Sequence, residues 1–393
     1  MIRKLIPILG ITFIDILGFS MLIPMLPYFV THFGASSFTV GILFSTFSFC
    51  QLIAGPLWGN ASDRIGRKSV LIISQVGATI GWAMLAFSPT ILWVFISRIV
   101  EGISGGNIGV TQAYVADLVE PKDRSRAFGY IGATFGAAMI FGPLAGGVLY
   151  AHFGFKVPFL AAAALQLITL IVTMLLLPES RSKSEGGEVV GLEQIAKTFR
   201  IPKLSRTLWQ KLALSLGLYA WFSVFALYLK AQLGFGLAET DYFFSIFAVL
   251  NVAINAFLIS RISDRLGDRG MSNLGLASLL ASFVLVPFAH GYALIVSVLA
   301  FFSFGMALSN TGITALISNA ASSSQQGTVL GVSSSLDSFA GIVSPPLSTG
   351  ALGLFGSSYA SVPSAIFAAF ALVMGMRVGR HEIAERKTAA ESA

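Results

Sequence analysis

Charged residues are scarce in this chain: they make up 11% of its 393 residues, whereas hydrophobic residues make up 55%. A water-soluble monomer of this length needs many more charged side chains to cover its surface. The composition therefore excludes an ordinary soluble globular protein and predicts a protein embedded in lipid.

Cysteine and histidine are scarce as well. The single cysteine, Cys50, excludes an intrachain disulfide and a cysteine-based metal site. The four histidines fall near predicted loops or in the carboxyl-terminal tail, and they form no recognisable dyad with an acid or a cysteine. We therefore expect no enzymatic activity, no metal site and no cofactor.

Long hydrophobic runs are abundant. A helix needs about 20 apolar residues to cross the hydrocarbon core of a bilayer. These runs are nearly uniformly apolar, which favours helices over a barrel with alternating polarity. The first run is too long, and lacks the cleavage site, for a removable signal peptide. The runs lie at 5–30, 38–58, 70–88, 91–118, 127–150, 157–177, 207–231, 240–260, 272–289, 291–318, 327–350 and 358–377.

Lys and Arg concentrate in every second loop. With a cytoplasmic amino terminus, only Lys156 and Lys230 lie in loops on the opposite side of the membrane. This bias follows the positive-inside rule, so both termini are expected in the cytoplasm. The net charge of +7 is then a topology signal and predicts no nucleic-acid partner. We expect an integral multi-pass protein of the cell membrane, which is the inner membrane in a bacterium.

The longest hydrophilic stretch divides the runs six and six. It predicts an amino-terminal bundle at 1–177, a cytoplasmic linker at 178–206 and a carboxyl-terminal bundle at 207–378. The charged tail at 379–393 lacks aromatic residues and is expected to be disordered. Part of the linker places apolar side chains on one helical face, which is typical of a surface helix. These side chains are Leu192, Ile195, Ala196 and Phe199.

An internal repeat relates the two halves. The charged segment 59–69 has a degenerate copy at 263–269, and an offset of 202 residues aligns Gly154 with Gly356. Halves related in this way are parallel repeats, which place a binding site at their interface near the bilayer midplane. The sequence therefore predicts an all-α membrane protein with twelve transmembrane helices in two pseudo-symmetric bundles.

The charged segment combines glycine with ion-pair partners. Gly59 and Gly66 permit close helix approach and a tight turn, and Asp117 at the end of the fourth run is a partner for Arg67. We expect a cytoplasmic gate that holds one side shut in one conformation. The alternative is that the basic residues serve topology alone. The gate residues are Gly59, Asp63, Arg64, Gly66, Arg67, Lys68 and Asp117.

Four ionisable residues lie well inside the hydrophobic runs, away from their ends: Asp15, Arg98, Glu101 and Asp337. An ionised group at the bilayer centre costs several kcal/mol, so such residues are functional by default. With three carboxyls for one guanidinium, at least one acid is expected to hold and release a proton. The alternative is a structural network of Arg98, Glu101 and Asp15, with Asp337 protonated and packed against its serine-rich neighbours.

Several segments resemble the major facilitator superfamily. The segment 59–69 is similar to its signature between helices 2 and 3, and 98–102 is similar to its fourth-helix motif. The fifth-helix motif of its drug:proton antiporter branch is similar to Gly142, Pro143, Gly146 and Gly147. The resemblance implies the twelve-helix fold and transport in exchange for protons.

Within that branch the first half resembles the tetracycline-efflux subgroup at 113–117, 124–129 and 177–180. Two departures argue against tetracycline itself as the substrate. The acidic position of the third helix falls on Gly81, and the ninth run, 273–289, contains no acid.

In the resembling fold the fourth, seventh and tenth helices line a central cavity. Polar and aromatic residues on these runs are the expected substrate-binding residues, with ordinary packing as the alternative in a chain of 33 Phe. They are Asn107, Gln112, Tyr219, Trp221, Phe222, Asn310 and Thr314. An apolar, aromatic cavity with spare carboxyls suits lipophilic cations or zwitterions.

The sequence thus predicts a monomeric secondary active transporter in the lipid bilayer. It would export small organic compounds in exchange for protons by alternating access, with the proton gradient as its energy source. A proton symporter or a facilitator for a small metabolite is one alternative. A scaffold or receptor without transport activity is another.

Overall fold

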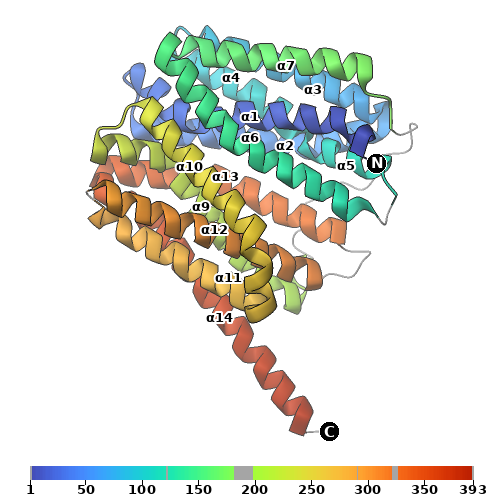
Figure 1. The fold of residues 1–393 in the computed structure, drawn as a ribbon, viewed down its shortest axis with the longest axis vertical. Coiled ribbons are helices and arrows are strands. Elements are labelled where there is room, and N and C mark those ends of the chain that lie inside the picture. The colour runs from blue at the N-terminus through green and yellow to red at the C-terminus, as the bar shows by residue number, and fades with distance from the viewer. Residues whose placement is uncertain (1, 121–122, 181–197, 290, 321–325, 392–393) are drawn as a thin grey trace. The chain divides into compact units, whose positions relative to one another are not determined.

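The computed structural model describes residues 2–120, 123–180, 198–289, 291–320 and 326–391. Within these ranges the regular secondary structure is helical (Figure 1). Twelve helices are long and apolar enough to cross a membrane, as predicted. A helix satisfies its backbone hydrogen bonds internally, which a chain in lipid requires.

The spans follow the predicted hydrophobic runs, although α11 begins 13 residues before the run predicted at 272–289 and includes a kink at Gly267. The first six are α1 (Ile2–His32), α2 (Ser37–Ile65), α3 (Arg67–Ala86), α4 (Ile91–Ser104) with η1 (Gly105–Asn107) and α5 (Ile108–Leu118), α6 (Arg124–Phe153) and α7 (Lys156–Leu176). The second six are α9 (Pro202–Leu233), α10 (Leu237–Phe257), α11 (Ile259–Leu285) with η3 (Val286–Phe288), α12 (Tyr292–Ala320), α13 (Gln326–Phe355), and η4 (Ser357–Tyr359) with α14 (Val362–Glu391).

The residues group into two compact units. The first unit contains Met1–Val189 and Leu229–Ala248, and the second contains Val190–Tyr228 and Val249–Ala393. In the first unit α1 packs along α6, and α3 packs along α4 and α7 (Figure 1). In the second unit α11 packs along α12 and α14. The bundle boundaries at 177 and 207 stay a prediction, because Leu229–Ala248 groups with the first unit.

Glycines with positive φ mark the internal repeat. In the described residues they fall into three pairs about 200 positions apart: Gly34 with Gly234, Gly66 with Gly267, and Gly154 with Gly356. Their φ angles lie between 66° and 100°, a region in which L side chains are strained. Each pair ends a helix or turns the chain at equivalent places, so both halves reuse the same turns.

The fourth span is broken by η1, where the sequence predicts one continuous run. A Cβ at Gly106 would lie 2.8 Å from the backbone nitrogen of Gly55, so α2 and η1 approach too closely for any side chain there. Gln51 Nε2 donates to the Gly105 carbonyl at 3.1 Å and satisfies an acceptor at the break. The interruption is therefore a packing feature of α2 against the fourth span.

The last helix continues beyond the predicted end of its span. The backbone of α14 stays helical to Glu391, although the sequence predicts disorder from residue 379. The segment after Gly379 contains good helix formers such as Ala, Glu and Lys and no further Gly or Pro, which favours the helix. The predicted surface helix lies outside the described residues, except for its carboxyl-terminal end at Phe199.

Candidate functional site

Arg98 and Glu101 form a buried ion pair on α4. Their side chains are 1% and 7% exposed, and Arg98 Nη1 contacts Glu101 Oε2 one turn along the same helix. The guanidinium lies over the Trp82 ring, 5.6 Å from its centroid. Two of the four predicted ionisable residues thus pair with each other, as their i,i+3 spacing allows.

Gly81 explains why Glu101 fits at this place. A Cβ at position 81 would lie 2.8 Å from Glu101 Cγ, so the Glu101 side chain packs directly on the bare backbone of α3. The tetracycline-efflux subgroup has an acid on its third helix at the position of Gly81. In this chain the side chain of Glu101 on α4 packs against that position instead.

Asp15 takes its partner from another helix. Its Oδ1 accepts a hydrogen bond of 2.8 Å from Gln166 Nε2 on α7. The alternative network of Arg98, Glu101 and Asp15 is replaced by two separate contacts, one ionic and one neutral. Gln166 is 3% exposed and was not predicted, since nothing in its local sequence points to Asp15.

Asp337 has a cation of its own, contrary to the prediction of one guanidinium for three acids. Lys211 Nζ on α9 lies 2.9 Å from Asp337 Oδ1, and Ser215 Oγ donates to the same oxygen at 2.5 Å. Lys211 was not among the predicted intramembrane charges, because it lies four residues after the predicted start of its run at 207; in the structure α9 begins at Pro202, and Lys211 is 6% exposed. The alternative of a protonated Asp337 packed against its serine-rich neighbours does not fit this contact with Lys211.

The residues expected to line a cavity have different surroundings. Trp221 is 1% exposed and packs with Phe225, Tyr228, Phe283 and Phe302, so packing rather than substrate contact accounts for it. Phe222 packs edge-to-face on Phe302.

The polar members of that set differ in exposure. Asn107 lies buried in η1, whereas Gln112, Asn310 and Thr314 are exposed and Tyr219 is 37% exposed. Asn310 Oδ1 also lies 3.4 Å from Lys211 Nζ, which links it to the second ion pair.

The turn between α2 and α3 gathers most of the predicted gate. Arg67 lies 2.7 Å from Asp63 Oδ1 and 3.4 Å from Asp117 Oδ2, and it donates to the Ser62 hydroxyl. The predicted contact between Arg67 and Asp117 is present. Gly66 has a φ of 100°, so the turn itself requires glycine.

Glu179 completes this turn and was missed as a gate residue. Its carboxylate accepts hydrogen bonds from the backbone N–H groups of Arg67 at 2.8 Å and Lys68 at 3.2 Å. An acid at a helix amino terminus satisfies free N–H groups and complements the helix dipole. We call Ser62, Asp63, Arg67, Asp117 and Glu179 the α2–α3 turn cluster.

The remaining gate residues lie apart from this cluster. A Cβ at Gly59 would meet no atom within 4 Å, so the expected close helix approach at that glycine is wrong. Arg64 is exposed. Lys68 Nζ donates to the Met174 carbonyl at 2.8 Å, which ties α3 to the end of α7.

The glycines of α6 are contact points for other helices. A Cβ at Gly142 would clash with Ser20 and Leu17 of α1, and one at Gly146 would lie 2.5 Å from Met21. Pro143 is buried, and α6 continues through it. A Cβ at Gly147 would lie 2.7 Å from the Cβ of Asp241 on α10.

Asp241 is a buried acid that was not predicted. It is 0% exposed, and it was not counted as an intramembrane charge because it lies one residue after the predicted start of its run at 240. Together with Lys211 it raises the number of ionisable residues inside the spans beyond the four predicted.

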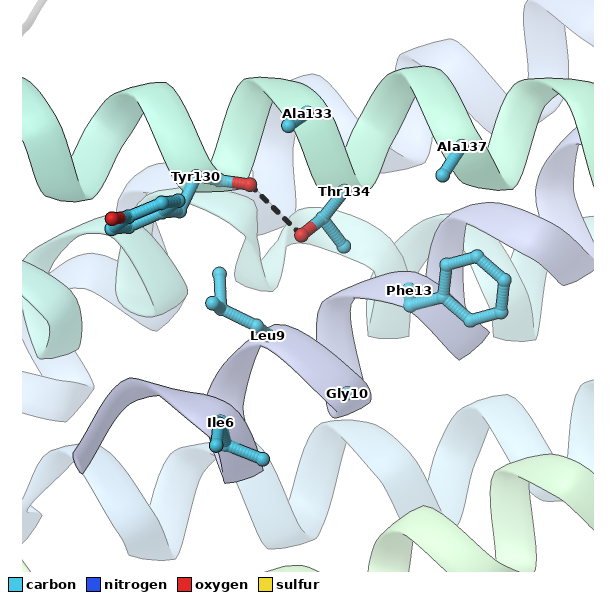
Figure 2. Close-up of a pocket in the computed structure, with 8 residues that line it drawn as sticks. All are labelled: Ile6, Leu9, Gly10, Phe13, Tyr130, Ala133, Thr134 and Ala137. Carbon is cyan, nitrogen blue, oxygen red and sulfur yellow. Dashed lines mark hydrogen bonds between the residues drawn. The ribbon is translucent and has the colours of Figure 1, made fainter. Parts of the chain in front are cut away.

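A groove of about 500 Å³ runs between α1 and α6. Figure 2 shows its apolar walls, with Thr134 turned to its own helix, where it donates to the Tyr130 carbonyl at 2.9 Å. None of the predicted substrate-binding residues lines it. The lining residues are Ile6, Leu9, Gly10, Phe13, Tyr130, Ala133, Thr134 and Ala137. Among the described residues no cluster of three His, Cys, Asp or Glu could hold a metal ion.

Comparisons with known proteins agree with this architecture. The family profile of the Major Facilitator Superfamily matches residues 8–345 and 213–392. Multidrug resistance protein 2 of Bacillus subtilis (strain 168) is 29% identical over 373 residues, which cover 93% of this chain and 91% of the relative. Tetracycline resistance protein, class C, of Escherichia coli is 28% identical over 387 residues, covering 94% and 95%.

A solved structure shows the same fold. It is a bacterial homolog to the human lysosomal transporter Spinster in an inward-facing and unoccupied conformation, with a TM-score of 0.82 and 13% identity. The match covers 96% of both chains. At this level of identity the likeness concerns the fold alone.

Proposed function

Because the chain belongs to the Major Facilitator Superfamily, we propose that it is a proton-coupled antiporter that exports lipophilic, cationic or zwitterionic, small organic compounds. Its relatives include a multidrug resistance protein and a tetracycline resistance protein, which favours an efflux-type transporter. With twelve candidate spans it is an integral multi-pass membrane protein. The bacterial inner membrane, cytoplasmic termini and a monomeric state are parts of the proposal.

The observation that supports proton coupling is the hydrogen bond between Asp15 and Gln166. This carboxyl lies inside a span, and its hydrogen bond comes from the neutral amide of Gln166. A primary amide donates to a carboxylate through its nitrogen and accepts from a carboxylic acid through its oxygen. Asp15 can therefore keep its partner whether it is protonated or ionised, which suits a group that binds and releases a proton in each cycle.

The ion pair on α4 is a second buried polar contact of the first unit. Arg98 stays ionised, so Glu101 has a permanent neutralising partner. Arg98 Nε and Glu101 Oε1 are buried without hydrogen-bond partners in the described residues. Since such atoms are costly to leave unpaired, the pair has hydrogen-bonding capacity for a group that arrives later in the cycle.

Alternating access assigns a role to the α2–α3 turn cluster. An ion pair that exists in one conformation biases the equilibrium by its differential energy. The contacts of Arg67 with Asp63 and Asp117 would thus favour one access state, and their loss would accompany the other. The exposed side chains of Gln112, Tyr219, Asn310 and Thr314 remain the proposed substrate contacts, and the apolar groove of Figure 2 offers a surface for lipophilic compounds.

The test is proton movement driven by substrate. Purified protein is reconstituted into proteoliposomes with an acidic interior and an internal pH indicator, and a fluorescent lipophilic cation is added outside. Antiport makes the interior more alkaline as the cation enters, whereas symport makes it more acidic. A facilitator would move the cation with no pH change, and a scaffold or receptor would move nothing.

Asp15→Asn is the matched variant, because the amide keeps the size of the carboxyl and cannot carry the proton. We expect normal expression and insertion with loss of substrate-driven proton movement. Asp264→Asn, at an exposed acid of α11, is the control and should behave as wild type. Near-normal proton-driven transport by Asp15→Asn would overturn the role given to Asp15.

A further inference from the structure

Asp241 is a buried carboxyl that the cycle described above does not use. It lies in the second turn of α10, within the first unit, and is 0% exposed. Neither Oδ1 nor Oδ2 has a hydrogen-bond partner among the described residues. An ionised carboxyl buried without a partner is among the costliest groups a protein can hold. The conformation seen here therefore requires the neutral acid.

The contact with α6 is tight at this acid. A Cβ at Gly147 would lie 2.7 Å from Asp241 Cβ and 3.0 Å from Oδ2. Any side chain at position 147 would push α10 away, so the glycine is what admits the Asp241 side chain against α6. Gly147, the last glycine of the α6 motif, and Asp241 of α10 are therefore in direct contact.

Neutral hydrogen bonds hold the neighbouring residue of α10 to α1. The Tyr28 hydroxyl lies 2.7 Å from Thr240 Oγ1 and donates to the Phe235 carbonyl at 2.9 Å. These bonds fix the start of α10 on the first unit without involving a charge. Asp241 is thus the ionisable element in a contact that is otherwise neutral.

Other titratable groups at this end have their own partners or face solvent. Lys230 Nζ lies 3.3 Å from Thr31 Oγ1 and 5.2 Å from the Tyr28 ring centroid. Glu239 is exposed. On α6, His152 Nδ1 lies 2.9 Å from the Val148 carbonyl and the Tyr150 ring packs on Phe155. No cation among these groups forms an ion pair with Asp241 that would allow it to stay ionised while buried.

We propose that Asp241 is a second proton-binding site, and that its protonated carboxyl clamps α10 against Gly147 of α6. When the proton leaves to water, the carboxylate must be hydrated, so α10 separates from α6 at this end. When the carboxylate binds a proton again, the neutral acid returns to the contact. Closure at this end is therefore favoured as the pH falls and lost as it rises. Proton binding by Asp241 does not depend on the proposed antiport, whereas its coupling to substrate transport does.

The experiment measures the distance between α6 and α10 as a function of pH. Cys50→Ser removes the single native cysteine, and spin labels are placed at Phe153 of α6 and Tyr242 of α10, which are 65% and 45% exposed. For one linked proton, the ratio of closed to open populations changes by up to about tenfold per pH unit. In Asp241→Asn the neutral amide should keep this end closed, with a ratio that no longer follows pH.

Two variants serve as controls. Glu239→Gln removes the neighbouring exposed acid and should leave the pH dependence unchanged. Tyr28→Phe removes the neutral bond to Thr240 and should lower the closed fraction at every pH while preserving its pH dependence. Infrared difference spectroscopy adds a direct reading, because a protonated carboxyl has a C=O stretching band that a carboxylate lacks. Loss of that band in Asp241→Asn, or in Asp241→Ser if the amide variant is poorly produced, is the expected result.

The inference is overturned if Asp241→Asn keeps the wild-type pH dependence, or if Glu239→Gln abolishes it. The proteoliposome assay on the same variants separates this failure from failure of the proposed function. If substrate still drives proton movement but closure does not depend on Asp241, antiport is supported and the second proton site is refuted. If closure depends on Asp241 but substrate drives no proton movement, the second proton site is supported and antiport is refuted.

Discussion

The two buried ion pairs of this chain differ in how they are built. Arg98 and Glu101 lie on one helix, with side chains that are 1% and 7% exposed. Lys211 and Asp337 lie on α9 and α13, with side chains that are 7% and 35% exposed. The first pair stays together however the helices move, because its geometry belongs to α4. The second pair joins two helices, so a shift of either helix can break it.

The chemistry of the cations follows the same division. Arg remains charged in proteins, while Lys can lose its proton when it is buried. The first unit thus combines a permanent charge with two further acids, Asp15 and Asp241, whose surroundings are neutral. The second unit holds one pair that joins two helices, Lys211 with Asp337. The proposed proton exchange therefore falls in the first unit, and the ion pair that a helix shift can break lies in the second.

The largest effect is expected from Glu101→Gln. It leaves the Arg98 guanidinium buried without a counter-ion, which costs about 3–5 kcal/mol. We expect a large drop in the thermal unfolding temperature in detergent, together with loss of transport. The double variant Arg98→Gln/Glu101→Gln should recover most of the stability and none of the transport. A single variant as stable as wild type would show that the first pair contributes little to folding.

A smaller effect is expected from Asp337→Asn. Its carboxyl is 35% exposed and Lys211 retains Asn310 as a neighbour, so the loss should be nearer 1–3 kcal/mol. The freed ammonium repels cations, so transport of cations should fall roughly tenfold relative to neutral compounds, an energy of about 1.4 kcal/mol. Transport of both classes is measured side by side between about pH 6 and 8, a range that spans neutral pH. If the variant transports cations and neutral compounds equally well, Asp337 has no role in substrate selection.

A third effect, of about 1 kcal/mol, is expected in the α2–α3 turn cluster. Glu179→Gln removes the charge that caps the amino terminus of α3, and charged caps contribute on this scale. The variant should lower turnover and increase labelling of reporter cysteines at the ends of α2 and α13. Glu120→Gln, at an exposed acid just after α5, is the control. Unchanged labelling and turnover would leave these residues with a topological role only.

The smallest effect is expected at the second copy of the turn. Asp264 is exposed, and Asp264→Asn should change stability by no more than about 0.5 kcal/mol, as for surface substitutions in general. Asp268 is different, because its carboxylate accepts from Ser263 at 3.2 Å and from Asn319 at 3.0 Å. Asp268→Asn should therefore exceed Asp264→Asn in a thermal unfolding measurement. The reverse order would mean that the second turn is organised by other contacts.

The spans and the first ion pair could be predicted from the sequence because both depend on neighbours along the chain. Apolar runs define helices locally, and a spacing of three residues brings Arg98 and Glu101 together on one face. The remaining contacts join residues far apart in sequence. Gln166 and Asp15 are separated by 151 residues, and Glu179 and Arg67 by 112. Hydrophobic periodicity does not reveal which distant residues form such pairs.

Two further residues were missed for a simpler reason. Lys211 and Asp241 lie within a few residues of the predicted starts of their runs, at 207 and 240, where a charge is ordinarily a loop residue. The helices start earlier in the structure, at Pro202 and Leu237. A charge close to the end of a run can therefore be either buried or solvated, and boundaries are the least certain part of a sequence-based assignment.

The same-helix pairing of Arg98 and Glu101 also bears on biosynthesis. The spans that contain the ion-pair residues Arg98, Glu101 and Asp337 have a mean hydropathy of 1.2, against 2.4 for Lys156–Leu176. A charge at a helix centre adds about 2.5–3.5 kcal/mol to the free energy of insertion by the translocon. Arg98 and Glu101 can neutralise each other while their helix is still the newest one made. Asp337 needs Lys211, which is synthesised earlier and is already in the bilayer when α13 arrives. Synthesis from the amino terminus therefore lets Arg98, Glu101 and Asp337 meet their partners at once, whereas Lys211 waits in the bilayer until α13 is made.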